Sequence, residues 1–489
     1  MTADPGRRMP FSGLWALIAS AVALAVLVAV AMVSTGAATA ARSELFPSPT
    51  PTATVPAWLV APSSAPTLAG ATPLSASAPT PDPASLAKTL DDRLKPGTGS
   101  ISAAVLDGAT GRTLYSRQGG EPRVPASNLK LLTAAAALTT LGPDATLRTS
   151  AVRGSDPGTV VLVGGGDVML GAAESQPDAV MGRAGMATLA AQTAAALTRA
   201  HDGAAPPAAV TVRLDDTLFT GPSINPGWAK EDVDAGEIAP LYSLALNAGR
   251  SAPGGAGPRP QDSAMDAANA FRAALAKALA ASGVKVADGV ERAAAPRGGA
   301  ELASVESATV AEQAGYALRE SDNYAAETLG RLASHAAGGP ASNDGAVAAL
   351  KAAAARILGS ADGFQLSDAC GLAIADRAAP LALAGLVRAM ASGADLRLRA
   401  ALDGLPVAAL DGTLAGRFGG TTAGGAGVVR AKTGTLNTVT ALSGYLVDTD
   451  GRLLVFSFVA NDLDPGARAQ AVSAVDAGAA ALAGCGCRG

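Results

Sequence analysis

Residues 124–138 place the strongest limit on what this chain can fold into. Pro125 and Ser127 suit the start of a helix, and the leucines and alanines that follow are strong helix formers with little polar surface. Gly142 and Pro143 then end the pattern. A helix that is apolar nearly all round belongs in a protein core. The stretch therefore predicts a buried helix around which other elements pack.

Two polar side chains lie at the entrance of this predicted core helix. Ser127 and Lys130 are three residues apart and share one helix face. Burial favours the neutral form of a lysine, and a neutral amine beside a serine hydroxyl is a general base beside a nucleophile. The positive end of the helix dipole also favours negative charge on the serine. The alternative is structural, with Ser127 capping the helix and Lys130 reaching solvent.

Two further motifs follow, Ser-Asp-Asn at residues 321–323 and Lys-Thr-Gly-Thr at residues 432–435. Alone, each has an ordinary explanation, a helix N-cap for Ser321 and a solvated strand end for Lys432. Ser-x-x-Lys, Ser-Asp-Asn and Lys-Thr-Gly in this order are the signature of penicillin-binding proteins and class A β-lactamases. Their predicted contexts, a helix start, an inter-helix loop and a strand, favour one catalytic constellation.

The first two motifs predict the groups that make and break bonds. Ser127 attacks a carbonyl carbon and forms an acyl-enzyme, while Lys130 accepts its proton. The hydroxyl of Ser321 can relay a proton to the leaving amine. The amide of Asn323 can hold both Lys130 and the substrate.

The third motif predicts substrate contacts. Lys432 presents a positive charge suited to a substrate carboxylate, and Thr433 or Thr435 adds a hydroxyl. Gly434 lets the substrate backbone lie against the strand because it has no side chain. The backbone N–H groups of Ser127 and Thr435 are the expected oxyanion donors, and losing one such donor typically costs about 3–4 kcal/mol of transition-state stabilisation.

From about residue 86 to 483 the chain resembles the D-alanyl-D-alanine carboxypeptidase/endopeptidase family of class C low-molecular-mass penicillin-binding proteins. The resemblance is carried by the three motifs and by further stretches at residues 162–167, 320–327, 405–407, 411–414, 417–418 and 431–436. It implies an α+β, serine β-lactamase-like domain with an antiparallel five-stranded sheet flanked by helices. It implies hydrolysis of the terminal D-Ala-D-Ala bond of peptidoglycan stem peptides, or of peptide cross-links. It also implies inhibition by β-lactams, with no cofactor and no metal.

One stretch departs from the family pattern. Where members often show Gly-Ser-Gly-Leu-Ser, residues 368–373 read Asp-Ala-Cys-Gly-Leu-Ala, so two hydroxyls are replaced. If this loop lines the cleft, we expect an altered substrate preference or rate. We expect Cys370 itself to be buried, because a free cysteine behaves as a small hydrophobe.

The N-terminal sequence does not predict a folded domain. Residues 1–12 are predicted to be cytoplasmic, and residues 13–33 form an uncharged apolar run long enough to span a bilayer. A signal peptide cleaved near residues 38–40 is the alternative, and both interpretations export the remaining chain. Residues 42–84, rich in Pro, Ser, Thr and Ala, are predicted to be an extended spacer.

The remainder divides into a catalytic domain, residues 85–144 and 306–489, and an inserted α+β domain, residues 145–305. Helices are expected at residues 86–94, 186–200, 264–282, 345–358, 380–392, 396–403 and 466–483, and on both sides of residues 321–323. Strands are expected at residues 101–107, 113–116, 160–167, 209–215, 284–287, 428–433, 439–447 and 453–460. The hairpin near residue 101 and the C-terminal strands should form one antiparallel sheet.

Composition excludes some functions. The net charge of −4 argues against general nucleic-acid binding, which requires a basic face. The two histidines, His201 and His335, have no histidine partner at metal-ligand spacing and suit ordinary surface positions. Cys485 and Cys487 are compatible with a short disulfide or with free thiols.

Two rival functions remain. A β-lactamase needs a group that drives water onto the acyl-enzyme, yet the only glutamate between the second and third motifs, Glu327, lies in the helix straight after Ser-Asp-Asn rather than on a separate loop. A non-catalytic wall-binding or β-lactam-sensing protein would not need Ser127 and Lys130 together.

The sequence does not decide between trimming stem peptides and cutting cross-links. The expected location is the outer cell surface, anchored to the membrane, or secreted if the N-terminal segment is cleaved.

Overall fold

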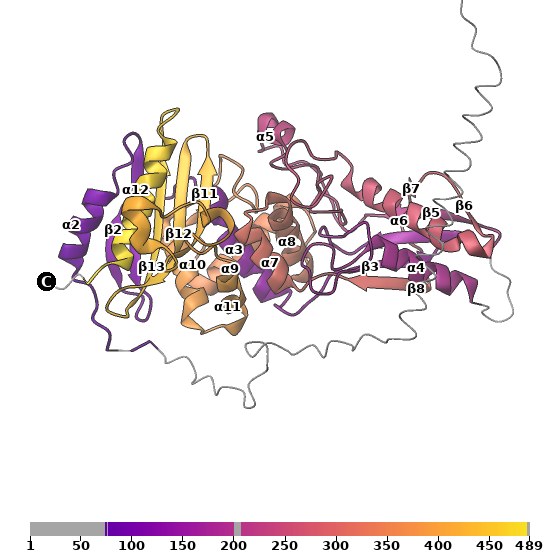
Figure 1. Cartoon of the computed structure of the whole chain (residues 1–489), viewed down its shortest axis with the longest axis horizontal. Coiled ribbons are helices and arrows are strands. Elements are labelled where there is room, and N and C mark those ends of the chain that lie inside the picture. Colours follow the sequence, from indigo (N-terminus) through magenta and orange to yellow (C-terminus); the bar gives the residue numbers. More distant parts are fainter. Residues whose placement is uncertain (1–73, 76, 200–206, 487–489) are drawn as a thin grey trace, which may run out of the picture. The chain divides into compact units, whose positions relative to one another are not determined.

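The computed structural model describes residues 74–75, 77–199 and 207–486 (Figure 1). The predictions for residues 1–12, 13–33 and 42–73 lie outside this part of the chain. Among the described residues, no helix combines the length and the apolar character needed to cross a membrane.

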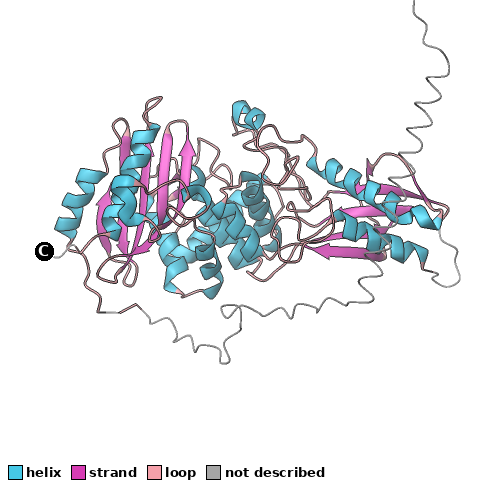
Figure 2. Cartoon of the chain, in the orientation of Figure 1, coloured by secondary structure: helices cyan, strands magenta, loops and turns pink. Residues whose placement is uncertain are grey.

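A five-stranded antiparallel sheet carries the catalytic part of the chain (Figure 2). Its strands follow the spatial order β11-β12-β13-β1-β2, so the N-terminal hairpin pairs with strands from the C-terminal end. The bounds are β1 Ser100–Asp107, β2 Thr113–Arg117, β11 Arg430–Leu436, β12 Val439–Val447 and β13 Leu453–Asn461. The predicted joining of the hairpin to the C-terminal strands, and the α+β class, are confirmed.

One face of this sheet packs against the first and last described helices, α2 (Pro83–Arg93) and α12 (Arg468–Ala483). Asp82 caps α2 by accepting a hydrogen bond from the backbone N–H of Ser85, and Pro83 occupies its first position. Leucines spaced by four along α2 are buried against alternate residues of β1 and β13. This layer covers the side of the sheet that does not face α3 (Lys130–Thr140).

The other face packs against a cluster of helices around α3 (Lys130–Thr140). All but the last residue of α3 are buried, as predicted for the core helix. Its neighbours are α7 Val310–Arg319, α8 Asn323–Ala336, α9 Asn343–Leu358, α10 Pro380–Ser392 and α11 Leu396–Asp403.

The entrance to α3 differs from the prediction. Ser127 lies in a 3₁₀ turn, Ala126–Leu129, and the α-helix begins only at Lys130. Ala126 has a φ of 47°, a left-handed conformation that a regular helix cannot contain. The chain is therefore bent immediately before the serine instead of entering a helix at Pro125.

A second sheet lies between the first two motifs in sequence. It has six strands with the path β6-β5-β4-β3-β8, and β7 pairs with β5. The strands are β3 Arg148–Arg153, β4 Thr159–Gly164, β5 Ala209–Asp215, β6 Lys285–Val286, β7 Glu291–Arg292 and β8 Glu301–Glu306. They pack with α4 (Met186–Thr198) and α6 (Ser263–Leu279) into a separate apolar cluster. The boundaries of an inserted domain at residues 145–305 stay a prediction.

Short elements complete the described chain. They are α5 Lys230–Ala235, the strand pair β9 Phe364–Gln365 and β10 Arg377–Ala378, and the 3₁₀ turns η2 Ala280–Ser282, η3 Gly412–Leu414 and η4 Gly420–Gly425. Cys485, one of the two C-terminal cysteines, is disulfide-bonded.

Phe458 offers a test of this packing. Its side chain is fully buried in the layer between the sheet and α12, with its ring 5.0 Å from that of Phe456. Phe458→Ala should lower the free energy of unfolding by about 3–5 kcal/mol, because a large cavity replaces the ring. The measurement is chemical denaturation. Leu396→Ala, at a side chain that is 70% exposed, is the control, and an equal effect in both variants would contradict the assigned packing.

Candidate active site

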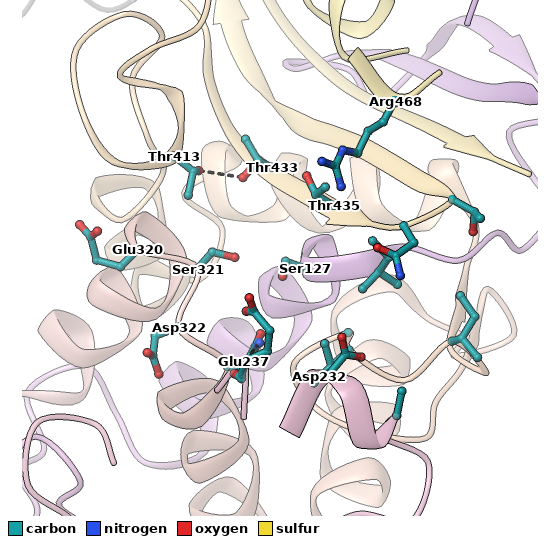
Figure 3. A pocket seen from close by; sticks show the side chains of 18 of the residues that line it. Ser127, Asp232, Glu237, Glu320, Ser321, Asp322, Thr413, Thr433, Thr435 and Arg468 are labelled. Carbon is teal, nitrogen blue, oxygen red and sulfur yellow. Dashed lines mark hydrogen bonds between the residues drawn. The ribbon is translucent and has the colours of Figure 1, made fainter. Parts of the chain in front are cut away.

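A pocket of about 750 Å³ brings the three motifs together (Figure 3). Ser127 reaches it from the turn before α3, Ser321 and Asn323 from the start of α8, and Thr433 and Thr435 from β11. These segments are far apart in sequence. Their meeting in one cavity is what the predicted constellation requires.

The amine of Lys130 lies at the centre of the site. Its Nζ is 2.8 Å from Ser127 Oγ, and it donates to Asn323 Oδ1 at 2.6 Å and to the Cys370 carbonyl at 2.8 Å. The residue is 1% exposed. Burial lowers the pKa of Lys130, although nearby acidic side chains act in the opposite direction. In its neutral form the amine would have two protons for these two acceptors and a lone pair free to face Ser127.

Two glycines allow the serine turn to approach its neighbours. A Cβ on Gly371, whose φ is 82°, would lie 2.0 Å from the carbonyl oxygen of Ala126. A Cβ on Gly434 would lie 2.8 Å from the carbonyl oxygen of Pro125. The missing side chain of Gly434 thus makes room for the turn that carries Ser127. The predicted approach of substrate backbone to Gly434 stays a prediction.

Lys432 is not the solvated strand end that was the structural alternative for it. It is 0% exposed, and its Nζ donates to Ser321 Oγ at 2.9 Å and to the Thr433 carbonyl at 2.8 Å. Burial, followed by the charge of Lys130, places the pKa of Lys432 well below its usual value. The amine lies behind the pocket because it reaches the Ser321 loop. Its direct contact with a substrate carboxylate stays a prediction.

Ser321 and Thr433 complete this side of the site. Ser321 has a φ of 58°, so the loop turns sharply before α8 and directs the hydroxyl toward Lys432. The hydroxyl of Thr433 donates to Thr413 Oγ1 at 2.7 Å (Figure 3). Thr413 belongs to the stretch at residues 411–414, which carried part of the family resemblance without a predicted role.

The loop at residues 368–373, which departs from the family pattern, lies beside Lys130 and contributes Gly371 and Leu372 to the pocket lining. The Asp368 carboxylate accepts hydrogen bonds from the backbone N–H groups of residues 370, 371, 372 and 373. It also accepts one from Trp228 Nε1 at 2.9 Å. This wrapping fixes the Cys370 carbonyl that holds Lys130. The available sequence signal for this arrangement was an aspartate, Asp368, directly before a stretch of small and apolar residues.

The side chains behind this loop do not face the pocket. Cys370 is free and buried, as expected, and its Sγ lies 3.4 Å from Asp368 Oδ2. Glu327 is also fully buried, and its Oε1 accepts from the Ala369 N–H at 2.7 Å. Burial raises the pKa of Glu327 to about 7. Single ligand atoms of Glu327, Asp368 and Cys370 lie within 4.8 Å of one another, but Asp368 already accepts several N–H groups, which argues against a metal there.

Further lining of the pocket comes from the region between the first and second motifs. Residues 227–259 supply Asp232, Glu237, Arg250 and Arg259 to the pocket lining. The backbone carbonyl of Glu237 accepts a hydrogen bond from Asn323 Nδ2 at 3.0 Å. This segment therefore both lines the pocket and holds the side-chain amide of Asn323. Nothing in the sequence of this region indicated that it would reach the site.

The Asp368 loop yields a stability test. Asp368→Ala should lower the free energy of unfolding by roughly 3–5 kcal/mol, because several buried N–H groups would lose their acceptor. Trp228→Phe, which removes only one of these donors, should cost about 1 kcal/mol. Both values come from chemical denaturation. Equal small losses in the two variants would show that the carboxylate does not hold the loop.

Comparison with known proteins agrees with this geometry. Residues 84–265 and 253–482 match the D-Ala-D-Ala carboxypeptidase 3 (S13) family. The chain is 36% identical over 424 residues to carboxypeptidase DacB of Mycolicibacterium smegmatis, covering 86% of this chain and 88% of that one. It is 35% identical over 426 residues to a carboxypeptidase of Mycobacterium tuberculosis, again covering 86% and 88%.

A solved structure shares the fold. Penicillin-binding protein 4 from Haemophilus influenzae superposes with a TM-score of 0.62 at 18% identity, over 79% of this chain and 97% of that chain. Together with the sequence matches, which extend over most of the chain, this leads to one assignment. The chain belongs to the D-Ala-D-Ala carboxypeptidase 3 (S13) family.

Proposed function

We propose that this protein is a β-lactam-sensitive serine D-Ala-D-Ala carboxypeptidase/endopeptidase, which acts on peptidoglycan stem peptides through an acyl-enzyme on Ser127. The observation that carries the proposal is the buried Lys130 amine, 2.8 Å from Ser127 Oγ and held by Asn323 and the Cys370 carbonyl. Membership of the S13 carboxypeptidase family supplies the substrate class. No cofactor takes part in the proposed reaction.

The acylation step follows from the positions of these groups. Ser127 Oγ attacks the carbonyl carbon of the penultimate D-alanine and transfers its proton to the Lys130 amine. The backbone N–H groups of Ser127 and Thr435 are proposed to stabilise the oxyanion. The C–N bond then breaks, and the leaving amine receives a proton through Ser321, whose hydroxyl contacts Lys432.

Deacylation returns the enzyme to its starting state. Water attacks the ester carbonyl, the ester C–O bond breaks, and Ser127 recovers its proton while the shortened peptide leaves. A β-lactam would acylate the same serine, but its ring-opened leaving group stays attached. The buried position of Glu327 supports slow turnover of such an adduct, since this carboxyl lies outside the pocket lining and cannot direct water onto the ester.

The proposed setting is outside the cytoplasm, where peptidoglycan is found. We propose that residues 13–33 anchor the chain to the membrane and that residues 42–84 separate the anchor from the folded part. We also propose that residues 85–144 and 306–489 form the catalytic domain and that residues 145–305 are its insert. The insert would form one wall of the substrate cleft.

Replacement of the nucleophile tests the proposed activity. Ser127→Ala should reduce release of D-alanine from a diacyl-L-Lys-D-Ala-D-Ala peptide by roughly 1,000-fold or more, because no acyl-enzyme can form. It should also lose covalent labelling by a fluorescent penicillin. Ser392→Ala, at an exposed serine at the end of α10, is the control. Equally low release by wild type and Ser127→Ala would refute the enzyme, and rapid wild-type turnover of a chromogenic cephalosporin would favour a β-lactamase.

The pH dependence tests Lys130 as the base. Its pKa in the folded protein is lowered from the ordinary 10.5, so the reactive neutral amine is present above that lowered value and lost by protonation below it. The value of kcat/KM for D-alanine release should therefore rise with pH at values below those expected for an ordinary lysine of pKa 10.5. Lys130→Arg should be inactive at every pH. A rise centred near the ordinary lysine pKa would exclude this role.

A further inference from the structure

The cations that line the active-site pocket differ in what they contact. The lining includes four arginines, Arg250, Arg259, Arg417 and Arg468. Arg259 and Arg250 lie 3.4 and 3.9 Å from the Asp322 carboxylate. Arg417 forms an ion pair with Asp476. Three of the four guanidinium groups therefore already have a carboxylate partner.

Arg468 is different. Within the part of the chain that the structure describes, its side chain has no ion pair and no hydrogen bond, and it is exposed. It is the first residue of α12, and Val472, one turn further along the same face, also lines the pocket. Figure 3 shows the guanidinium directed toward Thr435 and the space in front of Ser127. The guanidinium of Arg468 is therefore available to an anionic group of a substrate bound in the pocket.

Because Lys432 is buried, another cation is needed to bind a substrate carboxylate in the pocket. The leaving D-alanine carries a carboxylate next to the scissile bond, and this anion loses water when it enters the pocket. Lys432 is fully buried and uses its amine on Ser321 and Thr433, and its pKa is lowered. Thr433 donates its hydroxyl proton to Thr413. A further donor is therefore needed for a carboxylate that approaches β11 from the pocket.

We propose that Arg468, with the hydroxyl of Thr435, binds the carboxylate of the leaving D-alanine. This inference rests on the proposed function and names a specificity-determining residue for it. A guanidinium can donate two parallel hydrogen bonds to one carboxylate, which fixes the direction of the leaving group as well as its charge. The Arg468 side chain would select substrates that end in a free carboxylate, or cross-links that bear one at the same position.

The test compares two substrates with the same acyl part. One is the peptide that ends in D-Ala-D-Ala, and the other is an acyl-D-alanyl thioester whose thiol leaving group has no carboxylate. Arg468→Gln should reduce kcat/KM for the peptide by about 10- to 100-fold, since charge-assisted hydrogen bonds are lost. It should leave thioester hydrolysis unchanged. Arg468→Lys should lie between, because it keeps the charge but loses the two-point contact.

A matched control separates this effect from a general loss of charge. Arg399 on α11 is exposed, makes no ion pair among the described residues and does not line the pocket, so Arg399→Gln should change neither rate. Equal effects of Arg468→Gln on peptide and thioester, or no effect on either, would overturn the inference. Absence of wild-type activity on both substrates would instead contradict the proposed function, so the two failures are distinguishable.

Discussion

The site depends on removing the Lys130 amine from water. Burial disfavours the ammonium form and lowers the pKa of Lys130. The second buried lysine, Lys432, has its pKa lowered by burial and then by the like charge of Lys130. Two desolvated ammonium groups in one site would be costly, so the fold favours loss of a proton from at least one. The apolar alanines and leucines of α3 create this condition, because they bury the helix that carries Lys130 on every side. The chemistry of the nucleophile is therefore a property of the core.

The surrounding elements hold that amine in one position. Asn323, at the start of α8, and the Cys370 carbonyl, in the loop wrapped around Asp368, accept from it on separate sides. A side chain at Gly371 or Gly434 would meet the backbone carbonyl oxygens of Ala126 and Pro125, so the loop and strand β11 pack directly against the residues just before Ser127.

Sequence patterns predicted the groups whose chemistry is local. Ser127 and Lys130 stand three residues apart, and the five-stranded sheet follows from apolar strands next to short turns. The sequence patterns did not predict features that depend on contacts between residues far apart in the sequence. The 3₁₀ turn at Ser127 arises from the left-handed Ala126, which no propensity favours. The edge strand β8 and its neighbour β3 are rich in polar residues, and their strand form depends on pairing across more than a hundred residues. The burial of Lys432 likewise depends on the Ser321 loop.

Cys370, where the chain departs from the family pattern, does not line the pocket. The residues of that loop that line the pocket include Gly371 and Leu372, whereas the cysteine side chain turns inward toward Asp368. A replaced hydroxyl at this position therefore does not remove a contact with substrate. It changes what lies behind the carbonyl that holds Lys130, where a thiol is a weaker hydrogen-bond donor than a hydroxyl. Any effect on rate should therefore act through the position and proton affinity of the Lys130 amine, whereas the proposed determinant of substrate selection, Arg468, lies on a different element, α12.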